Sequence, residues 1–429
     1  MARQSSPRPK HRTSAEDTIG LDTRLVALRL LDAVLHRGEP LDQAAPPRLR
    51  ALERGDDRAL ALAIVGEVLR RLPDLDTLID SATREPLPED AKARTVLRMM
   101  LVQALRLGLP PHAVISTGLP LLMGGPRRLA HGVFSALLKQ EPALPHPPTL
   151  PAAVEARWSL AWPGRTPLIA AHIAEPPPLD LTLRDPAETA LWQERLGGIS
   201  LMPGHIRIAR AGAIENLPGF ADGNWWVQDL AASLPARLLG EGQGRRVLDL
   251  CAAPGGKTMQ LAAAGWSVTA LDKSARRLER LSDNLTRTGL QADIVTADAL
   301  QWEPDELFDA ILLDAPCSAT GTCRRHPDVL HRTPALGELV SLQKAMLERA
   351  AQWLKPDGRL VYAVCSLERE EGEDQATAFT ALTPDPIQAS ELPADLTPTP
   401  EGWLRSDPGM LAESGSIDGF FAARFAKPA

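Results

Sequence analysis

Residues 247–258 constrain the fold of this chain more than any other stretch, because they combine a short apolar run, a Pro-Gly-Gly turn and the start of an alanine-rich segment. Apart from Asp249, the run that ends at Leu250 has no polar alternation, which is typical of a strand covered on both faces. Gly255 and Gly256 allow a sharp bend and the close approach of a ligand. The free N–H groups of the helix that follows can hold a carboxylate or a phosphate. The stretch therefore predicts a strand, a ligand-binding turn and a helix.

Two kinds of ligand compete for such a turn. Gly256-Lys257-Thr258 looks like the end of a phosphate-binding P-loop, but that motif needs a glycine five residues before its second glycine, where this chain has Cys251. The alternative is the glycine turn of a class I S-adenosylmethionine-dependent methyltransferase. The sequence of such turns varies widely, so the residues that follow the turn must decide between the two ligands.

Length and composition point to a multidomain globular protein. The chain has 429 residues, which is too long for one ordinary core. Its net charge of -7 argues neither for nor against nucleic acid, because binding depends on local patches. We find no signal peptide and no apolar run of about 18 residues, and therefore expect a cytoplasmic protein that does not contact the membrane. None of the 4 cysteines forms a C-x-x-C pair, so we expect neither a bound metal nor a disulfide framework.

The N-terminal part predicts a basic tail and a helical domain. Residues 1–20 read as a disordered, solvated tail, with an arm that touches RNA phosphates as the alternative. Residues 21–141 read as an all-helical domain, since apolar side chains such as Leu28 and Leu31 recur at helical spacing. We expect further helices over residues 91–107 and 129–138, with a break at Pro110-Pro111.

Polar residues of the helical domain form no catalytic constellation. Asp56-Asp57-Arg58 are expected to cap an amphipathic helix, and His112 and His131 to be surface or packing residues. The domain reads as a binding or docking module. Two alternatives remain open for its arginines, namely contact with RNA phosphates and a solvated face: Arg70, Arg71, Arg94, Arg98, Arg127 and Arg128.

The rest of the chain predicts a connector and an α/β domain. A proline-rich segment ends at Pro151, and residues 152–224 read as a small α+β connector that contains a strand over Leu179–Arg184. Residues 225–429 alternate between strands and helices, which predicts a doubly wound, mostly parallel sheet. The expected strands are Val247–Leu250, Ser267–Asp272, Asp293–Ala297, Asp309–Asp314, Arg359–Val364, Met410–Leu411 and Phe420–Phe425, and a charged helix is expected over Ala275–Thr288.

Aspartates follow three of these strands, and the carboxyl ends of parallel strands form the ligand crevice of an open sheet. Asp272 lies about 20 residues after the glycine turn, where an acid accepts hydrogen bonds from ribose hydroxyls. Asp298 is placed for the adenine side, and Asp314 ends the fourth strand. One such aspartate is often a turn residue, but three in register with a glycine turn indicate a nucleoside ligand.

Two cysteines also follow strands at this edge. Cys317 comes after the fourth strand and Cys365 after the fifth, and neighbouring strands lie about 4.8 Å apart. Both thiols can therefore face one substrate. The alternative is that each is a small buried apolar residue.

These motifs resemble the RNA cytosine-C5 methyltransferases of the RsmB/NOP family. The resemblance rests on residues 251–257, on Asp314-Ala-Pro-Cys317-Ser and on Cys365-Ser-Leu, and residues 321–328 and 418–421 also look like family stretches. The helical domain resembles a NusB-like module, and this arrangement points to enzymes that act on 16S ribosomal RNA. One departure is Gly372, at or near which the family often has an asparagine.

The resemblance implies a Rossmann-like class I methyltransferase domain that uses S-adenosylmethionine. It implies that Cys365 adds to C6 of cytosine and that Cys317 serves the later elimination. It also implies that Asp314 hydrogen-bonds the base. The expected cofactor-binding residues are Cys251, Ala252, Ala253, Pro254, Gly255, Gly256, Lys257, Asp272, Arg277, Asp298 and Asp314.

Other functions stay open beside this one. The chain can be a non-catalytic RNA-binding regulatory protein, since a NusB-like module binds RNA or protein without catalysis. A P-loop nucleotidase is opposed by Cys251, and a methyltransferase acting on DNA or protein is a further alternative. We expect 16S ribosomal RNA as the partner and a monomeric protein.

Overall fold

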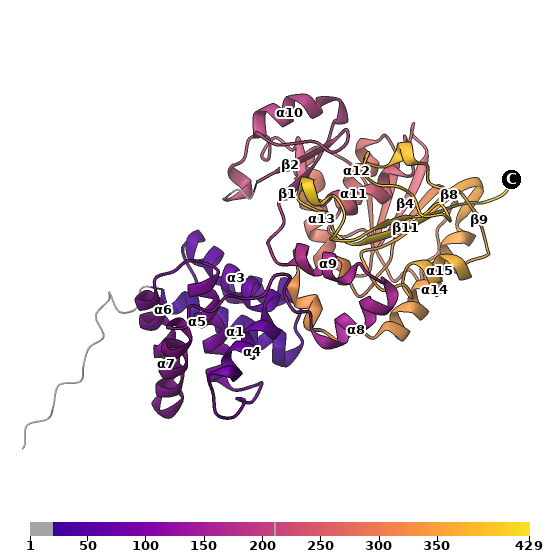
Figure 1. Ribbon diagram of the computed structural model, residues 1–429. Coiled ribbons are helices and arrows are strands. Elements are labelled where there is room, and N and C mark those ends of the chain that lie inside the picture. Colours follow the sequence, from indigo (N-terminus) through magenta and orange to yellow (C-terminus); the bar gives the residue numbers. More distant parts are fainter. Residues whose placement is uncertain (1–19, 210–211) are drawn as a thin grey trace, which may run out of the picture. The chain divides into compact units, whose positions relative to one another are not determined.

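The computed structural model describes residues 20–209 and 212–429, so the predicted tail over residues 1–20 lies almost wholly outside the described residues. The chain divides into two compact units (Figure 1). The helical unit comprises the chain up to Pro151 together with His326–Arg332. The sheet unit comprises Ala152–Arg325 and Thr333–Ala429.

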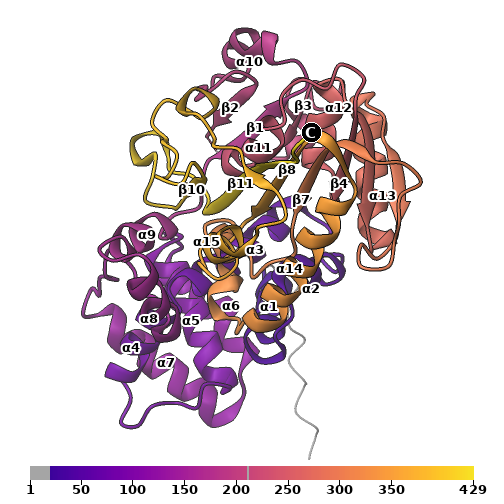
Figure 2. The ribbon, with the colours of Figure 1, turned by 90° about the vertical axis from the view of Figure 1, so that its right-hand side faces the viewer.

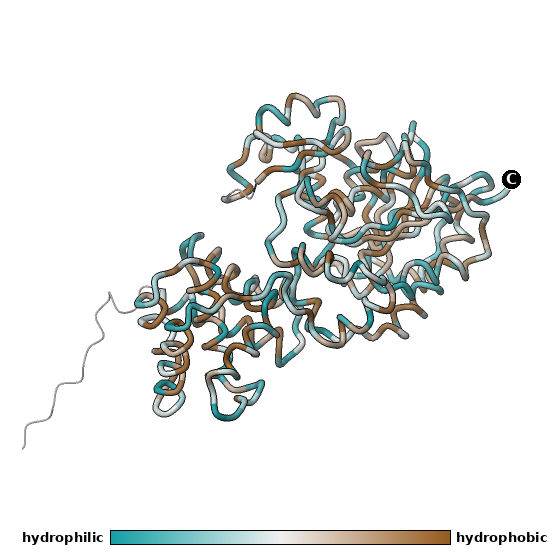
Figure 3. Tube along the Cα trace, viewed as in Figure 1, coloured by the Kyte–Doolittle hydropathy of each residue, from teal (hydrophilic) through white to brown (hydrophobic). Residues whose placement is uncertain are grey.

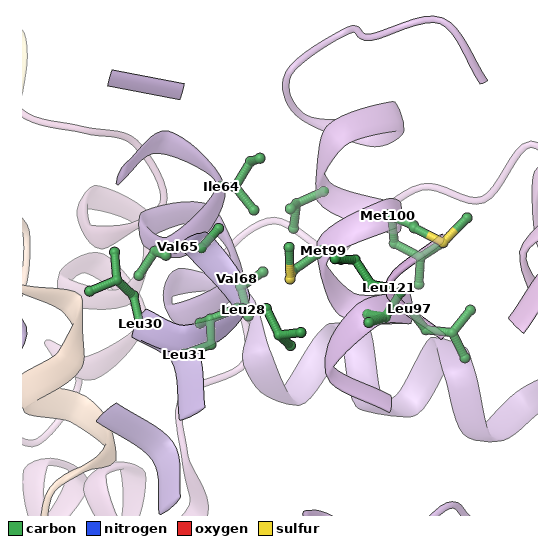
Figure 4. Close-up of a cluster of buried hydrophobic side chains, with 14 of the residues drawn as sticks. Leu28, Leu30, Leu31, Ile64, Val65, Val68, Leu97, Met99, Met100 and Leu121 are labelled. Carbon is green, nitrogen blue, oxygen red and sulfur yellow. The ribbon is translucent and has the colours of Figure 1, made fainter. Parts of the chain in front are cut away.

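Seven α-helices build the described part of the helical unit. Their apolar positions recur at helical spacing, and the helices bury them in one core around α1, α3 and α5. Figure 4 shows side chains from these helices meeting, among them Leu31, Val68 and Met99. The helices are α1 (Leu21–Arg37), α2 (Leu41–Leu49), α3 (Gly55–Arg70), α4 (Leu72–Ser81), α5 (Lys92–Leu105), α6 (Pro111–Gly118) and α7 (Gly124–Leu138).

One local prediction for this unit needs correction. Asp56 and Asp57 lie in the first turn of α3 and do not cap it, since the N-cap position is Arg54 and makes no side-chain cap bond. Acids in a first turn still favour the helix through its dipole. The break predicted at Pro110-Pro111 is present between α5 and α6, and Pro111 occupies the first position of α6, where proline costs no hydrogen bond. His112 and His131 are exposed, as predicted.

Four of the six arginines considered for RNA contact are buried, which contradicts both alternatives for them. Arg94 reaches Asp76 at 2.8 Å and Asp80 at 2.6 Å, and Arg98 makes a two-pronged contact with Asp76. Arg70 and Arg71 are likewise buried. Helical spacing cannot show this outcome, because a guanidinium group at an inner position is tolerated once acids pair with it.

Arg127 and Arg128 are exposed and stay candidates for RNA contact. They lie in the first turns of α7, on the same helix as the exposed His131.

The segment His326–Arg332 belongs to the helical unit although the chain before and after it belongs to the sheet unit. Its 3-10 helix η6 (Pro327–His331) packs on α3, and the His331 ring nitrogen lies 2.7 Å from the Leu69 carbonyl oxygen. Asp328 accepts a hydrogen bond of 3.2 Å from the Leu41 N–H. Sequence patterns did not predict this excursion.

The sheet unit starts with helices and a small antiparallel sheet. The sheet has the order β2-β1-β3, and Asp180 within it pairs with Arg207 at 2.7 Å, both side chains being buried. The predicted strand over Leu179–Arg184 is present as β1. The elements are α8 (Ala152–Ala161), α9 (Thr166–Ile173), β1 (Leu179–Leu183), α10 (Thr189–Leu196), β2 (His205–Ile208) and β3 (Trp225–Val227).

An 8-stranded sheet forms the centre of the unit, in the order β10-β11-β8-β7-β4-β5-β6, with β9 paired to β11. The run from β8 to β6 is parallel, and β11 and β10 are antiparallel, so the predicted mostly parallel, doubly wound sheet is confirmed. The strands are β4 (Arg246–Leu250), β5 (Ser267–Asp272), β6 (Asp293–Thr296), β7 (Phe308–Asp314), β8 (Leu354–Val364), β9 (Thr383–Pro384), β10 (Leu404–Ser406) and β11 (Phe420–Ala426).

Helices cover both faces of this sheet, which is why its central strands are continuously apolar (Figures 2 and 3). One face packs against α14 and α15, and the other against α11, α12 and α13. The helices are α11 (Leu230–Arg237), α12 (Gly256–Ala263), α13 (Ala275–Thr288), α14 (Leu336–Gln352) and α15 (Glu373–Ala378).

The strand predicted over Met410–Leu411 is wrong. That dipeptide lies in a turn, and the strand that pairs with β11 is β10, which starts at Leu404. Two apolar residues cannot be told from a loop by alternation, and only the pairing of Arg405 with Phe421 identifies the strand. Among the described helices, none combines the length and the hydropathy that a bilayer span requires.

Candidate active site at the carboxyl edge of the sheet

The predicted site residues gather where the parallel strands end. Cys251 follows β4, Asp272 ends β5, Asp314 ends β7 and Cys365 follows β8. Asp298 comes two residues after β6. Since β4 to β8 run in the same direction, their carboxyl ends share one edge of the sheet, and the sequence separation between these residues disappears.

The first turn has a backbone shape that few side chains allow. Cys251 and Gly255 adopt left-handed conformations with φ of 64° and 104°. A Cβ on Gly255 would lie 2.9 Å from Leu281 Cγ, so this position requires glycine on two grounds. The turn leads directly into α12, whose first residue is Gly256, and the N–H groups of that first turn face the edge of the sheet.

Asp272 is oriented by the turn it faces. Its Oδ2 accepts a hydrogen bond of 3.3 Å from the Ala253 N–H, and its Oδ1 accepts one of 2.9 Å from the Ser274 N–H. Arg277 lies 3.4 Å from the same carboxylate and donates to the Ala253 carbonyl oxygen. The acid is thereby fixed against the glycine turn. Asp298 is exposed, and its Oδ1 accepts a hydrogen bond of 2.9 Å from the Leu300 N–H.

The donor set at this edge fits S-adenosylmethionine. A carboxylate of the kind that Asp272 and Asp298 carry can accept hydrogen bonds from hydroxyl and amino groups such as those of ribose and adenine, and it favours a nearby positive charge. The turn at Gly255 keeps side chains out of the approach to the backbone. Beneath it, the buried Asp249 accepts a bond of 2.6 Å from Thr258, and its other oxygen has no partner among the described residues. Burial first of all raises the pKa of Asp249 to about 7.

The two predicted cysteines are in contact. β7 and β8 are paired in parallel, with Asp314 opposite Ala363, and the Sγ atoms of Cys317 and Cys365 lie 3.5 Å apart. Both residues are half-buried. The Gly321 N–H donates to the Cys365 carbonyl oxygen at 3.1 Å, which ties the loop after β7 to the loop after β8.

The pKa of Cys317 lies well above the ordinary thiol range. Its hydrogen bond with Cys365, its burial and the negative charge of Glu371 raise this pKa. In the contact between the two sulfurs, either atom can be the donor. The other two cysteines are not expected to act as nucleophiles. Burial raises the pKa of Cys251 and of Cys323 far above the ordinary range, so both stay neutral.

Asp314 and Lys257 form an ion pair beside the cysteines. Lys257 Nζ donates to Asp314 Oδ2 at 2.8 Å and lies 5.1 Å from the ring centre of Phe420. Burial works to lower the pKa of Lys257, but the Asp314 carboxylate outweighs it and the pKa is raised. The pair joins the cofactor turn to the end of β7. The Asp314 side chain keeps 29% of its surface exposed, so it can still meet a substrate.

The motif stretches at residues 321–328 and 418–421 contact each other next to the cysteine loops. A Cβ on Gly321 would lie 1.9 Å from the Gly419 carbonyl oxygen, and the Gly419 N–H donates to Gly321 at 2.8 Å, so the two backbones touch. Arg325 donates to Asp418 at 2.9 Å and also pairs with Asp229. These stretches therefore fasten the cysteine loop to β11.

Gly372, the departure from the family pattern, has no room for a side chain. A Cβ there would lie 2.7 Å from Nη2 of Arg405 and 2.9 Å from Phe421. Arg405 pairs with Glu373 and donates to the Ser366 carbonyl oxygen at 2.6 Å. In this chain the guanidinium group thus makes the loop contact next to Cys365.

Glu371 is a site residue that sequence reasoning missed. It is fully buried and hydrogen-bonds both cysteine loops. It stands in an acidic run that also contains Glu368, Glu370 and Glu373, and sequence alone does not show which of these acids turns inward. The one sequence feature that pointed to Glu371 was its position six residues after Cys365. No group of three potential metal ligands occurs among the described residues.

Comparison with known proteins agrees with this arrangement. Residues 236–426 match the family model "16S rRNA methyltransferase RsmB/F", and residues 21–121 match the NusB family. Curated relatives named ribosomal RNA small subunit methyltransferase B include those of Klebsiella pneumoniae (strain 342), 35% identical over 95% of this chain and 98% of its own length, and of Shewanella oneidensis, 34% identical over 95% and 99%.

Solved structures show the same fold. The protein titled PH0851 superimposes with a TM-score of 0.74 at 22% identity, covering 97% of this chain and 100% of its own. A methyltransferase homolog from Pyrococcus horikoshii gives a TM-score of 0.54 at 26% identity, covering 64% of this chain and 94% of its own. With its glycine turn, its helical unit and relatives matched along nearly their whole length, the chain belongs to the RsmB/F family of S-adenosylmethionine-dependent 16S rRNA methyltransferases.

Proposed function

We propose that this enzyme transfers a methyl group from S-adenosylmethionine to C5 of a cytosine in 16S ribosomal RNA, through a covalent bond between Cys365 and C6 of the base. The observation that carries the proposal is the pair of thiols 3.5 Å apart at the edge where the cofactor turn lies. The name that the relatives share supports ribosomal RNA as the substrate. We expect the enzyme to act in the cytoplasm.

The reaction needs a nucleophile because C5 of cytosine reacts poorly with electrophiles. Addition of a thiolate to C6 breaks the C5–C6 double bond and makes C5 enamine-like. S-adenosylmethionine, when bound, supplies the electrophilic methyl group. The thiolate is the reactive form of cysteine, so the sulfur that gives up its proton is the attacking one.

The contacts of the two sulfurs favour Cys365 as nucleophile. We propose that Cys317, whose pKa is raised, keeps its S–H during the attack and donates it toward Cys365, where it stabilises negative charge. After methyl transfer, a base must take the proton from C5, so that the C5–C6 double bond forms again and the bond between C6 and sulfur breaks, returning its electron pair to Cys365. We propose that the Cys317 sulfur, which lies next to the departing sulfur, takes this proton after releasing its own to solvent.

Asp314 is proposed to bind the N3/N4 edge of the base. Its ion pair with Lys257 orients the carboxylate at the end of β7, three residues before Cys317. A base inside a duplex cannot reach this edge of the sheet, so an unpaired region of the RNA is the easier substrate. We assign the cofactor to residues 251–257 together with Asp272, Arg277 and Asp298.

The experiment that tests the proposal uses Cys365→Ala and Cys317→Ala in the full chain. Cys365→Ala should abolish methyl transfer and leave no covalent protein–RNA species on a denaturing gel. Cys317→Ala should still attack and methylate, but should accumulate that species because elimination is slow. A trapped species in Cys365→Ala but not in Cys317→Ala would reverse the roles. Full activity in both variants would show that neither thiol takes part in the reaction and that both are packing residues.

The NusB family match supports a second candidate, a protein that binds RNA without catalysis. Bisulfite sequencing of 16S ribosomal RNA from a deletion strain separates the two. If the protein is the enzyme, one 5-methylcytosine should disappear from 16S ribosomal RNA in the deletion strain. The wild-type gene should restore it, and the Cys365→Ala gene should not. An unchanged methylation pattern in the deletion strain would favour the RNA-binding protein.

A further inference from the structure

Glu371 lies beneath the two cysteines and hydrogen-bonds the residue that follows each of them. Its Oε1 accepts from the Ser318 N–H at 2.9 Å, and its Oε2 accepts from the hydroxyls of Ser318 and Ser366, both at 2.5 Å. Ser318 directly follows Cys317, and Ser366 directly follows Cys365. One carboxylate thus joins two loops that are 48 residues apart in the chain.

The surroundings of Glu371 supply neutral donors. Gln343 of α14 donates to Oε1 at 3.0 Å and also to the Pro316 carbonyl oxygen at 2.9 Å, which holds the Cys317 loop from its other side. The Tyr362 hydroxyl donates to the backbone carbonyl oxygen of Glu371 at 2.5 Å. A carboxylate held by neutral groups keeps its negative charge available to act on neighbours, which a directly paired carboxylate does not.

Other charged groups nearby are already paired. Arg405 is bonded to Glu373, and Lys257 is bonded to Asp314 while it also acts electrostatically on Cys365. The groups that act on Cys317 are Cys365 and Glu371, with Tyr362 coupled to them in turn. Among these, Glu371 is the carboxylate that acts on Cys317.

We propose that Glu371 is a positioning residue that holds the Cys317 and Cys365 loops together and keeps the proton of the sulfur pair on Cys317. Geometry supports the first role, because the bonds from Glu371 to Ser318 and Ser366 add to the direct ties between the two loops. Charge supports the second, because negative charge under Cys317 disfavours its thiolate. The inference rests on the proposed function, in which the two sulfurs act at different steps.

The test measures the reaction of each thiol with iodoacetamide in the full chain without RNA, read peptide by peptide by mass spectrometry over a pH series. Glu371→Gln keeps the shape of the side chain and removes its charge. We expect Cys317 in this variant to react several-fold faster near neutral pH and its pH midpoint to fall, because its thiolate is no longer opposed. Glu370→Gln, an exposed acid in the same run, is the matched control and should leave both rates unchanged.

Glu371→Asp distinguishes the effect of the negative charge from the effect of side-chain length. It also keeps the proposal testable if Glu371→Gln fails to fold. It keeps the charge and shortens the side chain, so Cys317 should stay slow toward iodoacetamide, while kcat for methylation falls and KM for RNA changes little. Equal Cys317 rates in wild type and Glu371→Gln, or the same acceleration in Glu370→Gln, would overturn the proposal. Because alkylation needs no RNA, this outcome is distinct from failure of the proposed function, which full activity of Cys365→Ala would reveal.

Discussion

Acidic side chains have different partners in the arginine cluster of the helical unit and at the carboxyl edge of the 8-stranded sheet. In the helical unit, Asp76 receives two guanidinium groups, those of Arg94 and Arg98. In the sheet unit, Asp249 and Glu371 receive hydroxyl and amide donors. Paired charge cancels and acts as structure, whereas charge held by neutral donors shifts the protonation of its surroundings. The difference separates a scaffold from a reactive edge.

The largest effect should come from breaking the scaffold pairing. Arg98→Ala should lower the free energy of unfolding by roughly 3–5 kcal/mol, because truncation of this buried side chain leaves a cavity and Asp76 loses its two-pronged bond, keeping only Arg94. Urea unfolding of the full chain, followed through the helical signal, measures the loss. Cofactor affinity should not change. Arg84→Ala, at an exposed arginine, is the control, and equal stability of the two variants would show that the arginine cluster is not structural.

Neutralising a buried acid of the sheet unit should raise the free energy of unfolding, whereas loss of Arg98 should lower it. The pKa of Asp249 is about 7 in the folded chain and close to 3.8 in the unfolded one, so the folded state binds more protons between these values. The free energy of unfolding therefore falls as pH rises from about 4 to 7, by roughly 2–4 kcal/mol from this group.

Asp249→Asn should remove that dependence. The variant should gain stability over the wild type as pH rises through the same interval, and the two should agree more closely near pH 4. Urea midpoints over a pH series measure the difference. A constant difference between variant and wild type at all pH values would contradict a raised pKa for Asp249.

A smaller effect is expected for the acid that we assign to the cofactor. Asp272→Ala should weaken S-adenosylmethionine binding by roughly 1.5–3 kcal/mol, or about 10- to 100-fold, because hydrogen bonds to a charged group are lost. Calorimetry on the purified variant measures this, with Asp283→Ala on the exposed side of α13 as control. Unchanged affinity would sink the assignment of Asp272.

The smallest effect should come from the arginines that lack the buried pairing. Arg127→Ala and Arg128→Ala should leave stability within about 0.5 kcal/mol of the wild type, since both side chains are exposed. If they meet phosphates, RNA binding should weaken modestly and its salt dependence should become shallower. RNA binding titrated over a salt series gives the answer, and an unchanged slope would place RNA elsewhere on the chain.

Sequence reasoning succeeded where the signal was local. The helix over Ala275–Thr288 and the strand over Ser267–Asp272 have the bounds predicted for them, because apolar runs, turn residues and helix ends are written in consecutive residues. It failed for Met410–Leu411 and for the buried arginines. Those outcomes depend on which distant strand or acid lies opposite, and adjacent residues carry no record of that.

The sequence by itself determined the order of strands and helices and the side chains that follow each strand, including Asp314, Cys317 and Cys365. Those properties follow from hydrophobic periodicity and turn chemistry, which act over a few residues. Only the tertiary structure decided that Glu371 lies beneath both cysteines and that His326–Arg332 packs in the helical unit. These placements arise from hydrogen bonds and packing between segments far apart in the chain, whose free energy exists only once the fold brings them together.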